Sequence, residues 1–255
     1  MILRRLADAI RGQNWFTAAL EILIVVVGIF VGLQVNDWNE VRIDRGLETR
    51  YLERLHADLL ADLGRMDGSE NLANRRMQQA KLLLDGIADP EVVASQPIQF
   101  IEAVEKVSWS SYRPLTPNAY TELIGMGRTT LIRSESLRVA LAEYYSRIEF
   151  WAGVLNKASL DLEFSIASSG VLNIDYLTAI AKSGPAPGLP ELGADEGDAI
   201  SIAEEFKSRT QATRLLPVIY MSHYTVTLAI EEHRERNEAL QIAIEKHLKG
   251  GRDDQ

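Results

Sequence analysis

The longest apolar run of the chain covers residues 15–35, WFTAALEILIVVVGIFVGLQV, where Glu21 is the only residue with a formal charge. A helix rises about 1.5 Å per residue, so this run is long enough to cross the roughly 30 Å hydrocarbon layer of a bilayer. Trp15 and Trp38 flank the run, at the positions where interfacial aromatic side chains are enriched. The pattern predicts a single transmembrane helix over 15–35, with both tryptophans as membrane-interface anchors.

Beyond residue 35 the apolar side chains recur every three or four residues, which is the period of amphipathic helices. Residues 36–66 are predicted to continue the transmembrane segment as one helix, since no proline interrupts them. Further long helices are predicted over 69–88, 134–162 and 212–248, and short ones from Pro97, over 117–125 and over 175–182. Thr116 and Ser134 are the predicted N-caps of two of these helices. The fold class is therefore all-α, with a single N-terminal transmembrane helix followed by an antiparallel bundle of long amphipathic helices.

The segments between these helices are predicted from proline and glycine content. Residues 183–197 hold three Pro and four Gly among fifteen residues, which is typical of a mobile loop. Residues 128–133 are predicted as an extended connector, and residues 249–255 as a disordered tail. Pro217 is placed in or near the first turn of the last helix, where amide hydrogens lack intrahelical partners anyway.

Charges beside the apolar run predict its orientation. Three arginines and only one acidic residue precede it, whereas acidic and basic residues balance beyond it. The positive-inside rule then keeps residues 1–14 in the cytoplasm and exports the helical domain over 36–248. The predicted location is the inner (cytoplasmic) membrane, with a single pass and the C-terminal domain outside the cytoplasm, in the periplasm of a bacterium with two membranes.

A cleaved signal peptide is the alternative to an uncleaved anchor. The arginines would form its positive n-region and residues 22–33 its apolar core. The residues that follow, QVNDWNE, lack the small side chains of a cleavage site, which favours the uncleaved anchor.

The composition of the chain excludes some classes of partner and of chemistry. The chain has a formal net charge of −9, and residues 37–255 alone carry −10. Such an acidic domain repels nucleic acid, which is excluded as a partner. The chain has no cysteine, so disulfides and thiol chemistry are excluded as well.

The start of the chain resembles a known family. ALEILIVVVGIFVGLQVNDWNE followed by YLERLHADLLADL is similar to the opening of a large bacterial family of uncharacterised, membrane-anchored proteins, with a pattern of roughly GEIxLVxxGIxxALQxNNWNE and then YLxxLxxDL. The matching positions are Glu21, Gly28, Leu33, Gln34, Asn36, Trp38, Asn39 and Glu40, while Leu20, Gly32 and Asp37 depart from the pattern. The resemblance covers about residues 15–63. It implies a shared anchor and architecture, but no activity.

Gly28 and Gly32 form a GxxxG motif inside the apolar run, the spacing that lets two helix backbones approach closely. At about 100° per residue, Glu21 lies on the same face of the helix. A carboxyl group inside a bilayer is costly and requires a partner or a proton. This face is the predicted site of association, with a second copy of the chain or with a partner transmembrane helix. The alternative is that Glu21 reaches the membrane surface and the glycines are incidental.

Three of the four histidines, His223, His233 and His247, fall on the apolar stripe of the last helix. Histidine titrates near neutral pH, so these residues form a candidate pH-responsive seam. The favoured alternative is that each is half-exposed or hydrogen-bonded and has no such role.

No enzyme signature is present. GxGxxG, P-loop, HExxH and GxSxG motifs are all absent, and the histidines lack metal-ligand spacing, so no cofactor, metal or catalytic residue is predicted. The aromatic residues Tyr144, Tyr145, Phe150 and Trp151 favour packing over a ligand pocket. A cryptic site built from Glu122, Tyr144, Arg147 and Glu149 is left open.

These observations together favour a binding function. The prediction is a membrane-anchored sensory or scaffolding module that recognises a partner protein or a small ligand outside the cytoplasm. The alternative is a membrane-tethered enzyme whose active site carries no recognisable motif. Convergent polar groups in a deep pocket, with shifted pKa values, would favour the enzyme.

Overall fold

The computed structural model describes residues 15–155, 158–173, 175, 177–178 and 196–253. Its elements are α2 (Trp15–Ala88), α3 (Pro90–Ser95), α4 (Pro97–Lys106), α5 (Asn118–Gly125), the 3-10 helix η1 (Thr129–Leu131), α6 (Glu135–Leu155), α7 (Ala158–Ala167), α10 (Glu196–Ser208) and α11 (Thr210–Asp253). The described part of the chain contains no strand, so the predicted all-α class is confirmed.

Helix α2 is longer than predicted. Its 74 residues unite the expected continuous helix over 15–66 with the segment that we expected to be a second helix over 69–88. The expected break between residues 66 and 69 is absent because burial continues across it, with Met66, Ser69 and Ala73 all inaccessible to solvent. The hydroxyl of Ser69 also accepts a hydrogen bond from the Arg113 amide (2.9 Å), which fixes α2 to the loop after α4 at this point.

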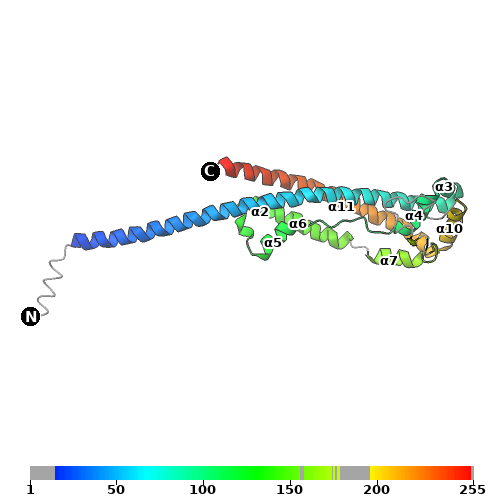
Figure 1. The fold of residues 1–255 in the computed structure, drawn as a ribbon, viewed down its shortest axis with the longest axis horizontal. Coiled ribbons are helices and arrows are strands. Elements are labelled where there is room, and N and C mark those ends of the chain that lie inside the picture. Colours follow the sequence, from blue (N-terminus) through cyan, green and yellow to red (C-terminus); the bar gives the residue numbers. More distant parts are fainter. Residues whose placement is uncertain (1–14, 156–157, 174, 176, 179–195, 254–255) are drawn as a thin grey trace, which may run out of the picture.

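Helix α11 lies beside α2 and runs in the opposite direction (Figure 1). Arg234 pairs with Asp67 and Glu70, and His247 contacts Glu48, so positions later in α11 contact positions earlier in α2. The predicted stripe of α11 is confirmed from Leu216 to Ile244. Its buried members are Leu216, Ile219, His223, Val226, Ile230, His233, Asn237, Leu240 and Ile244.

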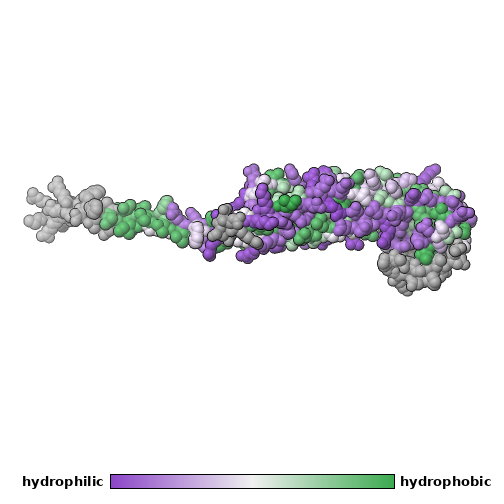
Figure 2. All heavy atoms as spheres, turned by 90° about the horizontal axis from the view of Figure 1, so that it is seen from above, coloured by the Kyte–Doolittle hydropathy of each residue, from purple (hydrophilic) through white to green (hydrophobic). Residues whose placement is uncertain are grey.

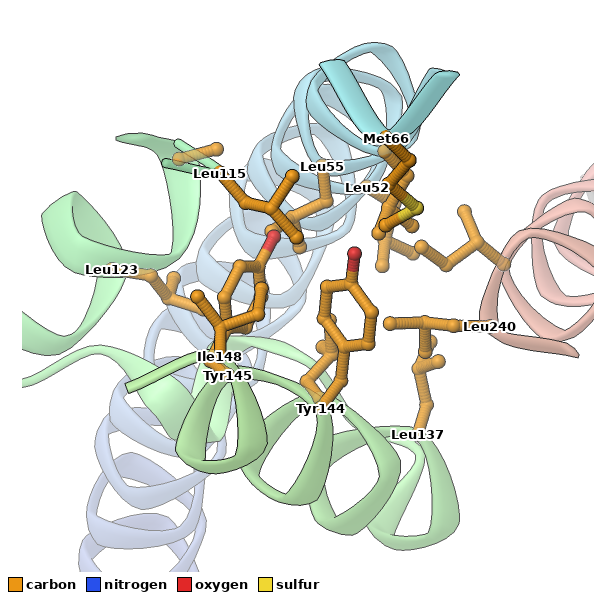
Figure 3. Packing of buried hydrophobic residues seen from close by; sticks show 14 of the residues in the cluster. Leu52, Leu55, Met66, Leu115, Leu123, Leu137, Tyr144, Tyr145, Ile148 and Leu240 are labelled. Atoms are coloured by element: carbon orange, nitrogen blue, oxygen red, sulfur yellow. The ribbon is translucent and has the colours of Figure 1, made fainter. Parts of the chain in front are cut away.

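Two apolar cores follow the α2–α11 pair. The core nearer the apolar run joins the middle of α2 to α5, α6 and the second half of α11, and includes Tyr144, Tyr145 and Leu240 (Figure 3). The other core joins the end of α2 to α3, α4, α7, α10 and the start of α11. The short helices thus cover one long helical pair at two places along its length (Figure 1).

Several predicted boundaries were wrong. The helix expected over 134–162 ends at Leu155, and Leu162 lies on α7 with an exposed side chain, outside the core. Thr116 does not cap α5, which begins at Asn118. Instead, the Thr116 hydroxyl accepts a hydrogen bond from Arg65 (2.6 Å) and its amide donates to Asp62 (3.1 Å). Tertiary partners therefore replace the local cap.

Other segments also differ from the prediction in their secondary structure or in where a helix begins. The connector over 128–133 contains η1 rather than extended backbone, and α3 and α10 were not predicted. Helix α11 begins at Thr210, which places Pro217 inside the helix, where burial of Ala212 and Leu216 stabilises the neighbouring turns.

The predicted terminal and loop segments lie mostly outside the described residues. Of the expected tail over 249–255, residues 249–253 are helical instead, because α11 continues to Asp253 and Lys249 pairs with Glu245 one turn earlier. The expected cytoplasmic segment 1–14 and the expected mobile loop over 183–195 fall outside the described residues, while residues 196–197 begin α10.

Candidate functional site

The first candidate site is the exposed apolar half of α2. Every residue from 22 to 46 is exposed, and large apolar side chains such as Ile22, Phe30 and Leu33 have no protein neighbours that cover them. Figure 2 shows the first part of this stretch as a continuous apolar surface, followed by polar residues that lead into a largely polar domain. In length and composition, α2 suffices to cross a membrane, and no other described helix does.

The predicted association face lies on this open stretch. A Cβ atom added at Gly28 or Gly32 would have no neighbour within 4 Å, so this face is free for another helix. Glu21 and Trp15 lie within α2, but their side chains are outside the described part of the structure. Trp38 is exposed, with the Arg42 guanidinium 5.9 Å from its ring centroid.

The buried carboxylate of Glu48 connects α2 to the domain, just C-terminal to this exposed stretch. The Glu48 side chain is only 3% exposed and accepts hydrogen bonds from the Arg133 amide (2.8 Å) and the Arg133 Nε (2.7 Å). The Nε2 atom of His247, on α11, lies 3.1 Å from the same carboxylate. Burial raises the pKa of Glu48, but the Arg133 hydrogen bonds and the charges of Arg133 and His247 outweigh it and hold the pKa below its usual value.

Further toward the C-terminus of α2, Asn237 of α11 joins three elements in the core that contains Tyr144 and Leu240. Its side-chain amide donates to the Leu59 carbonyl of α2 (3.1 Å) and contacts the Tyr144 hydroxyl of α6 (2.9 Å). A buried polar group needs such partners, so this contact fixes how α2, α6 and α11 align.

The three stripe histidines lie in different environments. His233 is fully buried, neither ring nitrogen has a hydrogen-bond partner, and burial lowers its pKa to about 4. Burial also lowers the pKa of His223, although the hydrogen bond to the Val107 carbonyl opposes this. Because that carbonyl can only accept, Nε2 of His223 carries the proton and Nδ1 accepts from Ser111 (2.9 Å). His247 is partly exposed beside Glu48. His223 and His233 are therefore neutral at pH 7.

A polar cluster in the second core was not predicted from the sequence. It brings together six buried polar side chains and three nearby carboxylates. They are Arg76, Gln79, Lys106, Ser108, Ser111 and His223, with Glu102, Glu105 and Asp161. Burial lowers the pKa of Arg76, and burial together with the charge of Asp161 raises that of Glu105. Three carboxylates lie near the two cations, so the positive charges of Arg76 and Lys106 are neutralised within the cluster.

The four residues of the suspected cryptic site do not meet. Glu122 binds Arg54 and the Tyr51 hydroxyl (2.8 Å), and these hydrogen bonds lower its pKa to about 2. Arg147 pairs with Glu232 on α11. Tyr144 and Tyr145 are core residues, whereas Phe150 is exposed and Trp151 donates to Glu232. Among the described residues, no group of acidic, histidine or cysteine side chains could hold a metal ion.

An open cleft of about 620 Å³ lies between the start of α6 and the end of α11. Its lining residues are Arg133, Ser134, Ser136, Leu137, Ala140, Ala243, Lys246, His247 and Gly250. Sequence reasoning missed this cleft because its residues come from separate segments that only the packing of α6 on α11 brings together.

These features define a class of protein: an all-α chain in which one helix carries an exposed apolar segment and then enters a packed helical domain. The chain belongs to a family of unknown function, DUF6090, whose model matches residues 21–177. This agrees with the resemblance of the anchor sequence to a family without known activity. No curated protein and no solved structure matches the chain.

Proposed function

We propose that this protein is a membrane-anchored helical binding module with a sensory or scaffolding role. Residues 1–14 lie in the cytoplasm, residues 15–35 cross the inner membrane once, and an antiparallel helical bundle outside the cytoplasm recognises a partner protein or a small ligand. The observation that carries the proposal is the continuity of α2, whose apolar half and packed half form one uninterrupted helix.

This continuity gives a physical route between domain and membrane. The 74 residues of α2 contain no proline and span about 110 Å at 1.5 Å per residue. Glu48, Leu59 and Arg76 lie on the same helix as Gly28, so a change in packing around them displaces or rotates the anchor. A flexible linker in the same place would absorb such a change.

Topology is the first test. The chain has no natural cysteine, so single cysteines report one position each. In intact cells, a cysteine at Glu53 should react with a membrane-impermeant maleimide, whereas one at Arg4 should react only after lysis. A phosphatase fused to the C-terminus should be active and stay with the membrane after alkaline washing. Reversed labelling, or release by washing, would refute the proposed anchor.

Association of the anchors is part of the same proposal, through the face of Glu21, Gly28 and Gly32. Replacing both glycines with Ile would hold the backbones apart and leave the span apolar. A disulfide-crosslinking assay on the full chain, with one cysteine at Val25, should show a lower dimer yield for this double variant. The matched control is Val27→Ile with Val31→Ile, which adds the same kind of bulk on another face. Equal yields from both double variants would exclude this face.

The role of the anchor carboxyl group can be separated from that of the glycines. Glu21→Gln keeps hydrogen bonding but removes the ionisable group, and Glu21→Leu removes both. Hydrogen bonds between transmembrane helices contribute only about 1–2 kcal/mol. Both variants should therefore lower the crosslinking yield less than the glycine changes do, and Leu more than Gln.

A membrane-tethered enzyme is the second candidate, and the Arg76–Glu105 cluster is the observation that favours it. Its polar groups converge and their pKa values are shifted, as in many active sites. None of the three described cavities is lined by a residue of this cluster, which favours a structural role. A hydrolysis activity of the purified chain that Glu105→Gln abolishes would support the enzyme over the binding module.

A further inference from the structure

The cleft between α6 and α11 has the size of a small-molecule site. Its volume of about 620 Å³ lies within the range of roughly 300–1,000 Å³ that is usual for such sites. A second hollow of about 180 Å³ continues it along the two helices, and Ala140 and Ala243 line both. The site can therefore take a group larger than a simple ion.

Cationic side chains line one end of the cleft. Arg133 and Lys246 supply the positive charges, and the His247 imidazole lies beside them. Among the described side chains, the carboxylate in contact with this group is Glu48, which Arg133 and His247 share. Lys246 forms no ion pair with any residue in the described ranges. The hydroxyls of Ser134 and Ser136, 3.0 Å apart, add two hydrogen-bonding groups at the same end. In a domain with a net charge of −10, this is a local excess of positive charge.

Apolar atoms line the rest of the cleft. Leu137 and Ala140 of α6 face Ala243 of α11. The second hollow adds Ala239 and Leu240 to this apolar surface, and Glu143 and Arg236 also line it. Alanine side chains leave the two helix backbones close to the cleft floor, which makes room for a flat or narrow apolar group. The cleft thus combines an anion-binding end with an apolar floor.

We propose that this cleft binds a small organic oxyanion. Its carboxylate or phosphate group lies between Arg133 and Lys246, and its apolar part lies on Leu137, Ala140 and Ala243. Arginine and lysine are the usual partners of both oxyanions. The inference deepens the proposed function, since it names the class of ligand that the binding module recognises.

The oxyanion could come from a soluble molecule or from a lipid headgroup, and the geometry favours the soluble source. Glu48, beside the cleft, lies thirteen residues beyond the predicted span, which is about 20 Å along a helix. The headgroup layer on each side of a bilayer is only about 5–8 Å thick. An upright α2 therefore holds the cleft above the headgroups.

Calorimetric titration of the purified full chain in a non-ionic detergent, at constant ionic strength, tests the proposal with three probes. Phenyl phosphate should bind about tenfold more tightly than inorganic phosphate, because its ring covers the apolar floor. Benzyl alcohol, which has the ring without the charge, should not bind measurably. Absence of phenyl phosphate binding would overturn the proposal.

Two variants with a matched control locate the site. Lys246→Gln should weaken phenyl phosphate binding by about fivefold to tenfold. Lys249→Gln removes the same charge three residues later, from a lysine that pairs with Glu245 and does not line the cleft, and should change nothing. Ala243→Leu should weaken phenyl phosphate more than inorganic phosphate. Equal binding by Lys246→Gln and the unaltered chain would refute this location.

Lipid bilayers of two compositions decide the source of the oxyanion. The chain is placed in nanodiscs of phosphatidylcholine, alone or mixed with phosphatidylglycerol. If the natural ligand is soluble, phenyl phosphate should bind with the same affinity in both kinds of nanodisc. A weaker affinity in the discs with phosphatidylglycerol, which disappears when Lys246 is replaced, would mean that the lipid headgroup occupies the site and would overturn the soluble source. The detergent titration does not depend on membrane orientation, so a failed topology test and a failed binding test are separate results.

Discussion

The two halves of α2 have the same secondary structure and opposite surroundings. From residue 22 to 46 every side chain is exposed, although most of the residues up to 35 are apolar. From Glu48 onward one side of the helix is buried in a repeat of three and four residues, against α11 and the shorter helices. A water-soluble helix does not leave such a long apolar surface uncovered. The first half is thus long and apolar enough to cross a membrane, whereas the apolar side of the second half is buried within the chain.

Polar groups differ between the halves as well. The buried side of the second half includes Glu48, Asp62, Ser69 and Arg76. Arg76 binds Gln79 within α2, whereas Glu48, Asp62 and Ser69 have partners outside α2, namely Arg133, the Thr116 amide and the Arg113 amide. A register shift of α2 would leave these groups buried and unpaired, at a cost of several kcal/mol. Polar contacts thus specify alignment in the second half, whereas the apolar segment of the first half, 22–35, carries no such groups.

The largest expected effect comes from the packed half. Leu59 is fully buried in the first core, so Leu59→Ala should lower the free energy of unfolding of the domain by about 2–5 kcal/mol. Leu33→Ala, on the exposed half, is the matched control and should leave the domain unchanged. Urea denaturation of the full chain in detergent, followed by circular dichroism, measures both. Equal destabilisation would mean that the halves are not independent.

The exposed half of α2 should be sensitive to an added charge rather than to the loss of an apolar side chain. Val27→Arg places a cation near the middle of the apolar run, where the apparent cost of membrane insertion is about 2.5–3.5 kcal/mol. The fraction of chain that resists alkaline washing of membranes should fall sharply. Ala57→Arg adds the same charge to the exposed side of the packed half and should leave that fraction unaltered. A Val27→Arg chain that stays fully inserted would contradict a lipid environment for this half.

Acid should act on the packed half through His233. Burial lowers its pKa to about 4, against 6.5 in an unfolded chain, so between these values the unfolded state binds a proton that the folded state does not. Stability should therefore fall as the pH drops from about 6.5 to about 4, by about 3 kcal/mol from this residue. His223, whose pKa is also lowered, acts in the same direction.

His233→Leu should flatten this part of the pH profile, measured as urea midpoints at a series of pH values. The control is His56→Gln, which replaces a more accessible histidine that contacts Glu245. An unchanged slope in His233→Leu would show that His233 is protonated in the folded state.

The smallest expected effect concerns Gly64 and Gly86 in the packed half of α2, where replacement by alanine should change stability in opposite directions. A Cβ atom at Gly64 would meet nothing within 4 Å, so Gly64→Ala should stabilise the domain by about 0.5–1 kcal/mol through helix propensity. Gly86→Ala should destabilise it, because the new Cβ atom would lie 2.6 Å from the Phe100 ring of α4. Thermal unfolding of both variants gives the two signs. A loss of stability in Gly64→Ala would mean that another molecule packs against this side of α2.

Much of the fold could be predicted from periodicity, because the two long helices bury continuous stripes. The positions from Leu216 to Ile244 on α11 are an example, and so are those from Leu52 to Met66 on α2. The ends of helices were less predictable, since they depend on partners far away in the chain. Thr116 has the side chain of an N-cap, yet its hydroxyl binds Arg65 on α2 instead. Gly68 has the character of a helix stop, but burial of its neighbours keeps α2 continuous.

The candidate sites also differ in whether the sequence alone could predict which residues come together. The shared helix face of Glu21, Gly28 and Gly32 could be predicted because the three residues lie within one helix, where spacing alone decides which residues share a face; association through this face stays a prediction. The cleft could not, since Arg133 and Lys246 are over a hundred residues apart and meet only through the packing of α6 on α11. The buried cluster around Arg76 likewise draws on four separate elements.

The sequence by itself determined the all-α class, the apolar segment over 15–35 and the buried stripe of α11, because each depends on the pattern within one stretch of chain. Tertiary structure decided that α2 continues unbroken past residue 66 to Ala88, that Glu48 is shared by Arg133 and His247, and that a cationic cleft opens beside it. These features arise when distant segments bury polar groups together. A buried carboxylate needs donors wherever along the chain they come from, and local patterns of residues do not record that pairing.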